Sequence, residues 1–203
     1  MRSITHGPLE AHSSHLRVLR DVVTDLEAAQ LRDAFPEVPK DEIDSVDGYP
    51  TFDYALPRLM QDCTKRSSAL GRVPQHVCEL EQAVAAKVRP FVLQALNDWG
   101  LSDGRDLKLC SSFVRRYIRH ERRWIGPHPD DSVITVNILL NDPADYVGGL
   151  MVFPPDLRGH VIYPERERNA AVMHRGDVEH AVDIRRGWRY SWIMFWDFVC
   201  SEP

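Results

Sequence analysis

The second half of the chain limits the possible folds more than any other feature of the sequence. After residue 106 it is a series of short runs rich in β-branched and aromatic residues, each bounded by turn-forming residues. These runs are LKLCSSFVRRYI (107–118), VITVNILLN (133–141), GGLMVFP (148–154), HVIYP (160–164), NAAVMHRGD (169–177) and RYSWIMFWDF (189–198). Strands at this spacing, with no helical pattern between them, are typical of antiparallel sandwiches and barrels. We therefore predict a mainly β core over residues 106–200.

The first half of the chain contains the helical patterns. Thr24 and Glu27 have the spacing of a capping box, which predicts a helix over residues 24–35. Apolar residues keep helical spacing over residues 77–100, and Gly100 is suited to end that helix. Pro90 lies inside this segment and should kink the helix or split it in two.

The other segments complete a single predicted domain over residues 1–203. Residues 1–15 have the composition of a loose polar arm, and residues 16–23 alternate enough to form a strand. Residues 36–75 are irregular and rich in proline, so they form either a lid over a site or a packed surface excursion with a short helix, and residues 44–75 are the candidate lid. In this division, residues 16–105 give the β core its helical support and its candidate lid.

Charge and cysteine content narrow the class of protein. The 203-residue chain has 25 basic and 30 acidic residues and a net charge of −5, which argues against a nucleic-acid partner. One basic stretch, RRYIRHERR (115–123), is either a solvated strand edge or a rim that attracts an anionic substrate. The cysteines are widely spaced without a CxxC motif, so we expect reduced thiols; they are Cys63, Cys78, Cys110 and Cys200.

Neither a signal peptide nor a membrane span is visible in the sequence. The N-terminus lacks the apolar core of a secretory signal, and no apolar run approaches the roughly 18 residues of a transmembrane helix. We therefore expect a soluble intracellular protein, cytoplasmic by default, without a membrane partner.

The segment IGPHPDDSVITVNILLND (125–142) places potential metal ligands at the mouth of a predicted buried strand. In an extended chain, residues i and i+2 point to the same side, so His128 and Asp130 can aim an imidazole and a carboxylate at one point. Asp131 is the alternative carboxylate. His180, 52 residues after His128 on a later predicted strand, is the candidate third ligand. Two imidazoles and one carboxylate form the facial triad that binds non-haem Fe(II) and leaves positions open for a chelating cosubstrate and O2.

Arg189 and Ser191 form a candidate carboxylate-binding pair. Arginine suits bidentate carboxylate recognition, and these two residues alternate to one face of the same predicted strand. Three further histidines have no matching partner and are interpreted as surface residues or as hydrogen-bonded strand residues; they are His120, His160 and His174. Trp188, Trp192 and Trp196 are expected in core or rim packing, and Gly148 and Gly149 in a tight turn or bulge.

Together these pieces resemble the 2-oxoglutarate/Fe(II) dioxygenases, in particular their prolyl 4-hydroxylase-like branch. The resemblance covers roughly residues 107–198. It is carried, in the family's order, by HPD (128–130), ITVNILLND (134–142), YVGGLMVFPP (146–155), HRGDVEHAV (174–182) and RGWRYSWIMFW (186–196). An HxD motif alone is a weak indication, but the ordered combination with a distal histidine and an arginine is specific.

The resemblance implies a double-stranded β-helix, the jelly-roll or cupin-like fold, and a role for each matching residue. His128, Asp130 and His180 match the iron ligands. Arg189 matches the residue that pairs with the distal carboxylate of 2-oxoglutarate, Ser191 the hydroxyl two residues on, and Tyr117 a tyrosine that faces the cosubstrate. In two places the chain departs from the family. Leu139 stands where another tyrosine is common, and apolar residues follow the Gly148–Gly149 pair near the substrate mouth.

The implied activity is hydroxylation of a substrate C–H bond, with 2-oxoglutarate oxidised to succinate and CO2 by O2 and with ascorbate as a possible reductant. A prolyl or other residue of a protein or peptide is the substrate that the branch implies, and a free amino acid or small metabolite is the alternative. Two interpretations from other classes stand beside this one. In the first, the chain is a catalytically silent jelly-roll that binds a partner. In the second, it is a zinc hydrolase that uses the same ligands.

Overall fold

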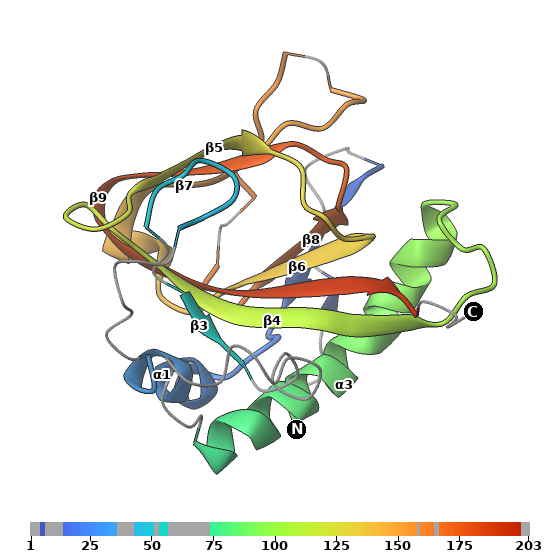
Figure 1. Cartoon of the computed structure of the whole chain (residues 1–203), viewed down its shortest axis with the longest axis horizontal. Coiled ribbons are helices and arrows are strands. Elements are labelled where there is room, and N and C mark those ends of the chain that lie inside the picture. The colour runs from blue at the N-terminus through green and yellow to red at the C-terminus, as the bar shows by residue number, and fades with distance from the viewer. Residues whose placement is uncertain are drawn as a thin grey trace.

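The computed structural model describes residues 5–6, 14–35, 43–50, 53–56, 74–157, 159–164 and 167–199. Within these residues the larger sheet is antiparallel, with strand order β1-β2-β8-β6-β9-β4-β3 (Figure 1). The strands of this sheet are β1 (Thr5–His6), β2 (Leu16–Arg20), β3 (Asp53–Ala55), β4 (Leu107–Ile118), β6 (Ile134–Leu139), β8 (Ala171–Arg175) and β9 (His180–Phe198). Three strands from the N-terminal half, β1, β2 and β3, therefore take part in the larger sheet. The assignment of the whole chain to one domain stays a prediction.

One long strand, β9, belongs to two sheets. Residues 188–198 pair with β4 and β6, whereas residues 180–187 pair with β5 (Trp124–His128) and β7 (Tyr146–Val152). The smaller sheet thereby lies over one face of the larger sheet (Figure 1). This arrangement confirms the predicted mainly β, jelly-roll fold.

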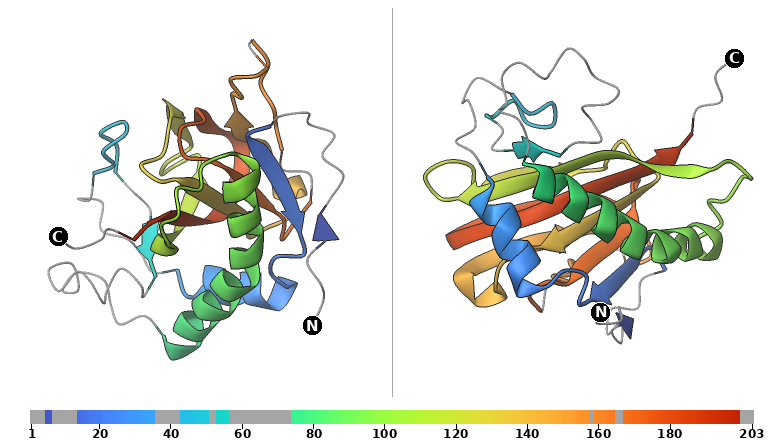
Figure 2. Two further views of the ribbon diagram at one scale, coloured as in Figure 1. Left: turned by 90° about the vertical axis from the view of Figure 1, so that its right-hand side faces the viewer. Right: turned by 90° about the horizontal axis from the view of Figure 1, so that it is seen from below.

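Two helices cover the other face of the larger sheet (Figure 2). They are α1 (Asp25–Asp33) and α3 (Gln75–Asp98), and a short 3-10 helix, η1 (Pro143–Asp145), follows β6. Strand β6 shows how the two faces are used. Ile134, Val136 and Ile138 belong to the hydrophobic cluster that includes the helices, whereas the alternate residue Leu139 belongs to a second cluster between the sheets. Both faces of β6 are therefore buried. Neither α1 nor α3 is long and apolar enough to cross a membrane.

The helix ends follow the local sequence. Thr24 and Glu27 form the predicted capping box at the start of α1. At the end of α3, Gly100 has a φ of +66°, and the Leu101 N–H donates to Leu96 O at 2.9 Å, as in a Schellman motif. The helix continues through Pro90 without a break, so the predicted split does not occur.

Other expectations fall partly outside the described residues. Gly148 and Gly149 have positive φ angles at a register shift between β7 and β9, which confirms the expected bulge. The HVIYP run (160–164) contributes only an isolated bridge between Ile162 and Val152. Cys78 and Cys110 are free thiols; Cys63, Cys200, most of the expected arm and most of the candidate lid lie outside the described residues.

Candidate active site

Three of the predicted ligands converge at one end of the space between the two sheets. His128 ends β5 and His180 begins β9, and the two residues are direct cross-strand partners. Asp130 follows two residues after His128. One ligand atom from each of these residues lies within 4.8 Å of the others. Asp131 is exposed and does not belong to this group.

Backbone carbonyls set the tautomer of both histidines. His128 Nδ1 lies 2.7 Å from Gly126 O, and His180 Nδ1 lies 3.1 Å from Val178 O. A carbonyl oxygen only accepts, so each Nδ1 carries the hydrogen and each Nε2 keeps its lone pair. The two Nε2 atoms lie 3.9 Å and 3.5 Å from the oxygens of Asp130. Two neutral imidazole nitrogens and one carboxylate in this state are a ligand set that suits a divalent cation.

The carboxylate of Asp130 is held from both sides of its loop. Thr135, on β6, donates its hydroxyl to Asp130 Oδ2 at 2.5 Å. The Asp130 N–H donates to Gly176 O at 2.8 Å. Gly176 has no room for a side chain, because an added Cβ would lie 1.7 Å from Ser132 O. The loop between β5 and β6 therefore packs directly against the turn after β8. This contact fixes the position of Asp130.

Burial keeps the imidazole of His180 neutral. Loss of solvation, reinforced by His174 and opposed by Asp130, lowers the pKa of His180 from 6.5 to about 3. The Nε2 lone pair of His180 is thus available to a metal ion across the whole physiological pH range.

The second predicted pair lies further along the same interior. Arg189 and Ser191 have no exposed surface, and Arg189 donates to Asn137 Oδ1 at 3.0 Å. The hydroxyl oxygen of Ser191 is buried and has no hydrogen-bond partner within the described residues. Tyr117 is the cross-strand partner of Arg189, whose guanidinium carbon lies 5.6 Å from the centre of its ring. A buried cation beside a buried, unpartnered hydroxyl is a site that an incoming carboxylate can satisfy.

Tyr117 is almost fully buried, and desolvation raises the pKa of its phenol despite the arginines Arg115, Arg189 and Arg122 around it. It therefore offers a neutral hydroxyl rather than a phenolate. Leu139, at the position where the family often has a tyrosine, is directly opposite Ser191 and contributes only apolar surface there.

Three residues of this interior were not predicted as site residues from the sequence: Thr135, Asn137 and His174. Each is a buried polar residue inside an otherwise apolar strand, with Thr135 and Asn137 on β6 and His174 on β8. That contrast is visible in the sequence and could have marked all three. His174 was expected on the surface or with its hydrogen bonds satisfied. It is fully buried, and only its Nδ1 has a hydrogen-bond partner among the described residues.

Ion pairs connect the described part of the candidate lid to β4 and to the turn that follows β4. Arg115 makes two 2.6 Å hydrogen bonds to Asp53 and lies 2.9 Å from Asp44. Arg122 lies 3.1 Å from Asp44 and 3.0 Å from Asp47. The expectation of a solvated strand edge is therefore wrong for Arg115 and Arg122, which are bound by acidic residues of this same chain.

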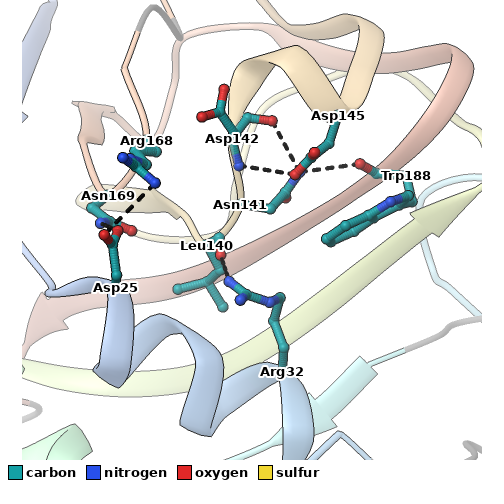
Figure 3. Close-up of a pocket in the computed structure, with 9 residues that line it drawn as sticks. All are labelled: Asp25, Arg32, Leu140, Asn141, Asp142, Asp145, Arg168, Asn169 and Trp188. Atoms are coloured by element: carbon teal, nitrogen blue, oxygen red, sulfur yellow. Dashed lines mark hydrogen bonds and ion pairs between the residues drawn. The ribbon is translucent and has the colours of Figure 1, made fainter.

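A separate cavity of about 240 Å³ opens near α1 and η1 (Figure 3). Its polar groups bind one another: Asn169 donates to Asp25 at 2.6 Å, and Asn141 donates to Asp145 at 3.2 Å. The cavity lies beyond the carboxyl end of β6, where Leu140 and Asn141 line it. Asp130 is held near the amino end of that strand, so this cavity is not the metal-ligand cluster.

The sequence matches no family model and no curated protein. Solved structures do match in three dimensions. A prolyl hydroxylase from Trichoplax adhaerens, in complex with a hypoxia inducible factor peptide fragment, has a TM-score of 0.62 at 12% identity, covering 91% of this chain and 84% of that one. The viral collagen prolyl hydroxylase of Paramecium bursaria Chlorella virus-1, as a 2-oxoglutarate complex, has a TM-score of 0.55 at 15% identity, covering 95% and 100%.

A third matched solved structure is that of an epimerase and not of a prolyl hydroxylase. The non-haem α-ketoglutarate-dependent epimerase SnoN of nogalamycin biosynthesis has a TM-score of 0.60 at 14% identity, covering 91% of this chain and 76% of that one. At these identities the comparisons show a shared fold: the chain has the jelly-roll of solved 2-oxoglutarate/Fe(II) oxygenases.

Proposed function

We propose that this protein is a 2-oxoglutarate-dependent oxygenase that holds Fe(II) on His128, Asp130 and His180. One observation carries the proposal. A complete set of metal ligands and a buried arginine face the same interior space of one jelly-roll, as they would to bind the two ends of a chelating dicarboxylate. A zinc hydrolase would need only the metal ligands and not the buried arginine.

Each residue has a defined part in this proposal. His128 and His180 would donate Nε2 to the metal, and Asp130, oriented by Thr135, would supply one oxygen. Arg189 and Ser191 would bind the distal carboxylate of 2-oxoglutarate, with Tyr117 closing the site beside them. When bound, the iron supplies the activation of O2 that oxidises the cosubstrate and the substrate. The protein contributes position and a dry interior.

The interior row of β6 fits a cosubstrate of this kind. Thr135 contacts the metal-binding carboxylate and Asn137 contacts Arg189, and two residues along a strand cover about 7 Å. A five-carbon dicarboxylate bound to the metal at one end would therefore reach the arginine at the other.

For the substrate, we propose a prolyl or other residue of a peptide or protein. Support comes from the two matched prolyl hydroxylases, one of which is a peptide complex. The same chemistry on a small molecule is the second candidate, because the matched epimerase belongs to the biosynthesis of a small natural product.

The test is to measure succinate formed from 2-oxoglutarate by the purified protein with Fe(II), O2 and ascorbate, with and without proline-rich peptides. We expect turnover that peptides stimulate and that His180→Ala abolishes. Binding of 2-oxoglutarate to the Mn(II)-loaded protein is measured in parallel, with Arg189→Met as the variant that should lose it.

The two measurements separate the alternatives. Binding of 2-oxoglutarate with turnover but without any peptide effect would move the proposal to a small-molecule substrate. A protein that binds metal but neither binds nor consumes 2-oxoglutarate would contradict the proposal and favour the silent jelly-roll.

A further inference from the structure

The strand β8 carries a third histidine, which is fully buried, beside the proposed metal ligands. The ring centre of His174 lies 4.6 Å from that of His180, and its Nε2 lies 4.0 Å from Asp130 Oδ2. The imidazole has no exposed surface. On β6, its cross-strand neighbour is Thr135, the residue that donates to Asp130.

His174 is held in the same way as the two histidine ligands. Its Nδ1 lies 2.8 Å from the carbonyl oxygen of Arg175, so Nδ1 carries the hydrogen and Nε2 carries a lone pair. This Nε2 is buried and has no hydrogen-bond partner among the described residues. The nearby Asp130 oxygen cannot serve, because a carboxylate oxygen is also an acceptor. A donor for Nε2 must therefore come from outside the described residues.

We propose that His174 is a positioning residue of the metal centre, whose Nε2 accepts a hydrogen bond from a water molecule held between His174 and Asp130. This inference rests on the proposed metal centre. Two acceptors 4.0 Å apart can both be reached by one water with hydrogen bonds of about 2.8 Å. Such a water donates both hydrogens, one to Nε2 and one to the carboxylate, and its oxygen lone pair is left for a cation.

The structural cost of His174 favours this role over simple packing. A buried acceptor without a donor destabilises the fold, whereas an apolar side chain at the same place would not. The neighbour Met173, on the opposite face of β8, is apolar and lies in the helix-side cluster. Packing alone therefore does not explain a polar side chain at residue 174. Residues that contact metal ligands commonly change metal affinity by about 10- to 100-fold.

The test compares the full-length protein with three variants, using Co(II) as the probe. His174→Phe removes the acceptor and keeps a ring, His174→Gln keeps a polar side chain, and Met173→Leu is the control on the same strand. Co(II) affinity is measured by competition with a chelator, the visible absorption of bound Co(II) is recorded, and thermal unfolding is followed in EDTA.

We expect His174→Phe to lower Co(II) affinity at least tenfold and to shift the visible spectrum, without lowering the unfolding temperature in EDTA. His174→Gln should recover part of the affinity, and Met173→Leu should match the native protein. Native affinity and an unchanged spectrum in His174→Phe would overturn the inference, as would a loss of affinity that follows a loss of stability in both His174 variants.

This outcome is distinct from a failure of the proposed function. If the native protein does not bind Co(II), or if His180→Ala binds it equally well, the metal centre itself is wrong. If the native protein binds Co(II), His180→Ala does not, and His174→Phe is unaffected, only the role of His174 is wrong.

Discussion

The hydroxyl of Thr135 offers the most direct test of how the protein orients Asp130, the carboxylate of the proposed metal centre. The substitution Thr135→Val removes the hydrogen bond to Asp130 and keeps the shape of a side chain that is buried on a central strand. Valine also suits a strand, so the change is confined to one donor. We expect the metal to bind more weakly to this variant and the metal-free protein to be less stable.

The expected losses of stability and of metal affinity follow from the hydrogen bond between Thr135 and Asp130. The donor lies 2.5 Å from Asp130 Oδ2, and a hydrogen bond to a charged group contributes about 1.5–3 kcal/mol to stability. It is the one side-chain hydrogen bond that the described residues give this carboxylate. Loss of a group that orients a metal ligand lowers affinity by about 10- to 100-fold, which corresponds to about 1.4–2.7 kcal/mol.

The assay has two parts and one control. Urea unfolding in EDTA gives the stability of the metal-free protein, and chelator competition gives the affinity for Mn(II) or Co(II). The control is Ser132→Ala, which removes the 3.0 Å contact between Ser132 and Thr135 but leaves the bond to Asp130. We expect the control to retain nearly native metal affinity.

The sign of the affinity change decides the mechanism. If the hydroxyl only satisfied a buried charge, a bound cation would take over that role, and metal affinity would rise in Thr135→Val. If the hydroxyl orients the carboxylate, affinity falls. An unchanged or higher affinity would refute the reasoning that Thr135 positions Asp130.

Three further predictions concern the same interior. Gly176→Ala should lower metal affinity more than tenfold in the chelator assay, because its Cβ would collide with Ser132 O and displace the loop between β5 and β6; unchanged affinity would contradict this. Asn137→Leu should raise the dissociation constant of 2-oxoglutarate about tenfold, measured with Mn(II) present, because Arg189 loses a charge-assisted partner; native binding would show that Asn137 is dispensable. In EDTA, the free energy of unfolding should fall by about 2 kcal/mol between pH 7.5 and pH 5, because the unfolded chain protonates His180 below its ordinary pKa of 6.5 and the folded chain does so only near 3. His180→Gln should flatten that profile of urea midpoints, and a profile that His180→Gln leaves unchanged would count against the buried, neutral imidazole.

The elements that were predicted best from the sequence are those whose signal lies within one short segment. The LKLCSSFVRRYI run became β4 with the same bounds, and the capping box at Thr24 began α1 where expected. The first half of β9 was harder to predict, because residues 180–187 pair with β5 and β7 across a second sheet. Local pattern does not encode which distant strands a segment will join, or that one strand will bend from one sheet into another.

The structure groups Asp130, and not Asp131, with His128 and His180, for a reason that strand alternation does not supply. Strand alternation was the basis for predicting Asp130, yet β5 ends at His128, so Asp130 lies beyond the strand. What fixes it is the hydrogen bond from its N–H to Gly176 O and the donor on Thr135. Thr135 lies five residues after Asp130, whereas Gly176 lies in the turn after β8. These two contacts became visible only when β8 and the start of β6 were placed beside the HxD motif.

The register of β6 ties the two halves of the candidate site together. Thr135 and Asn137 face the interior, one toward Asp130 and the other toward Arg189, while Val136 and Ile138 face the helices. A slip of one residue would exchange the two faces. It would remove the carboxylate's donor and the arginine's acceptor in the same step, and it would bury two polar groups against α3. Because β6 pairs with β8 on one side and β9 on the other, and both of its faces are buried, such a slip is strongly disfavoured. The register of β6 therefore sets the distance between Asp130 and the buried Arg189.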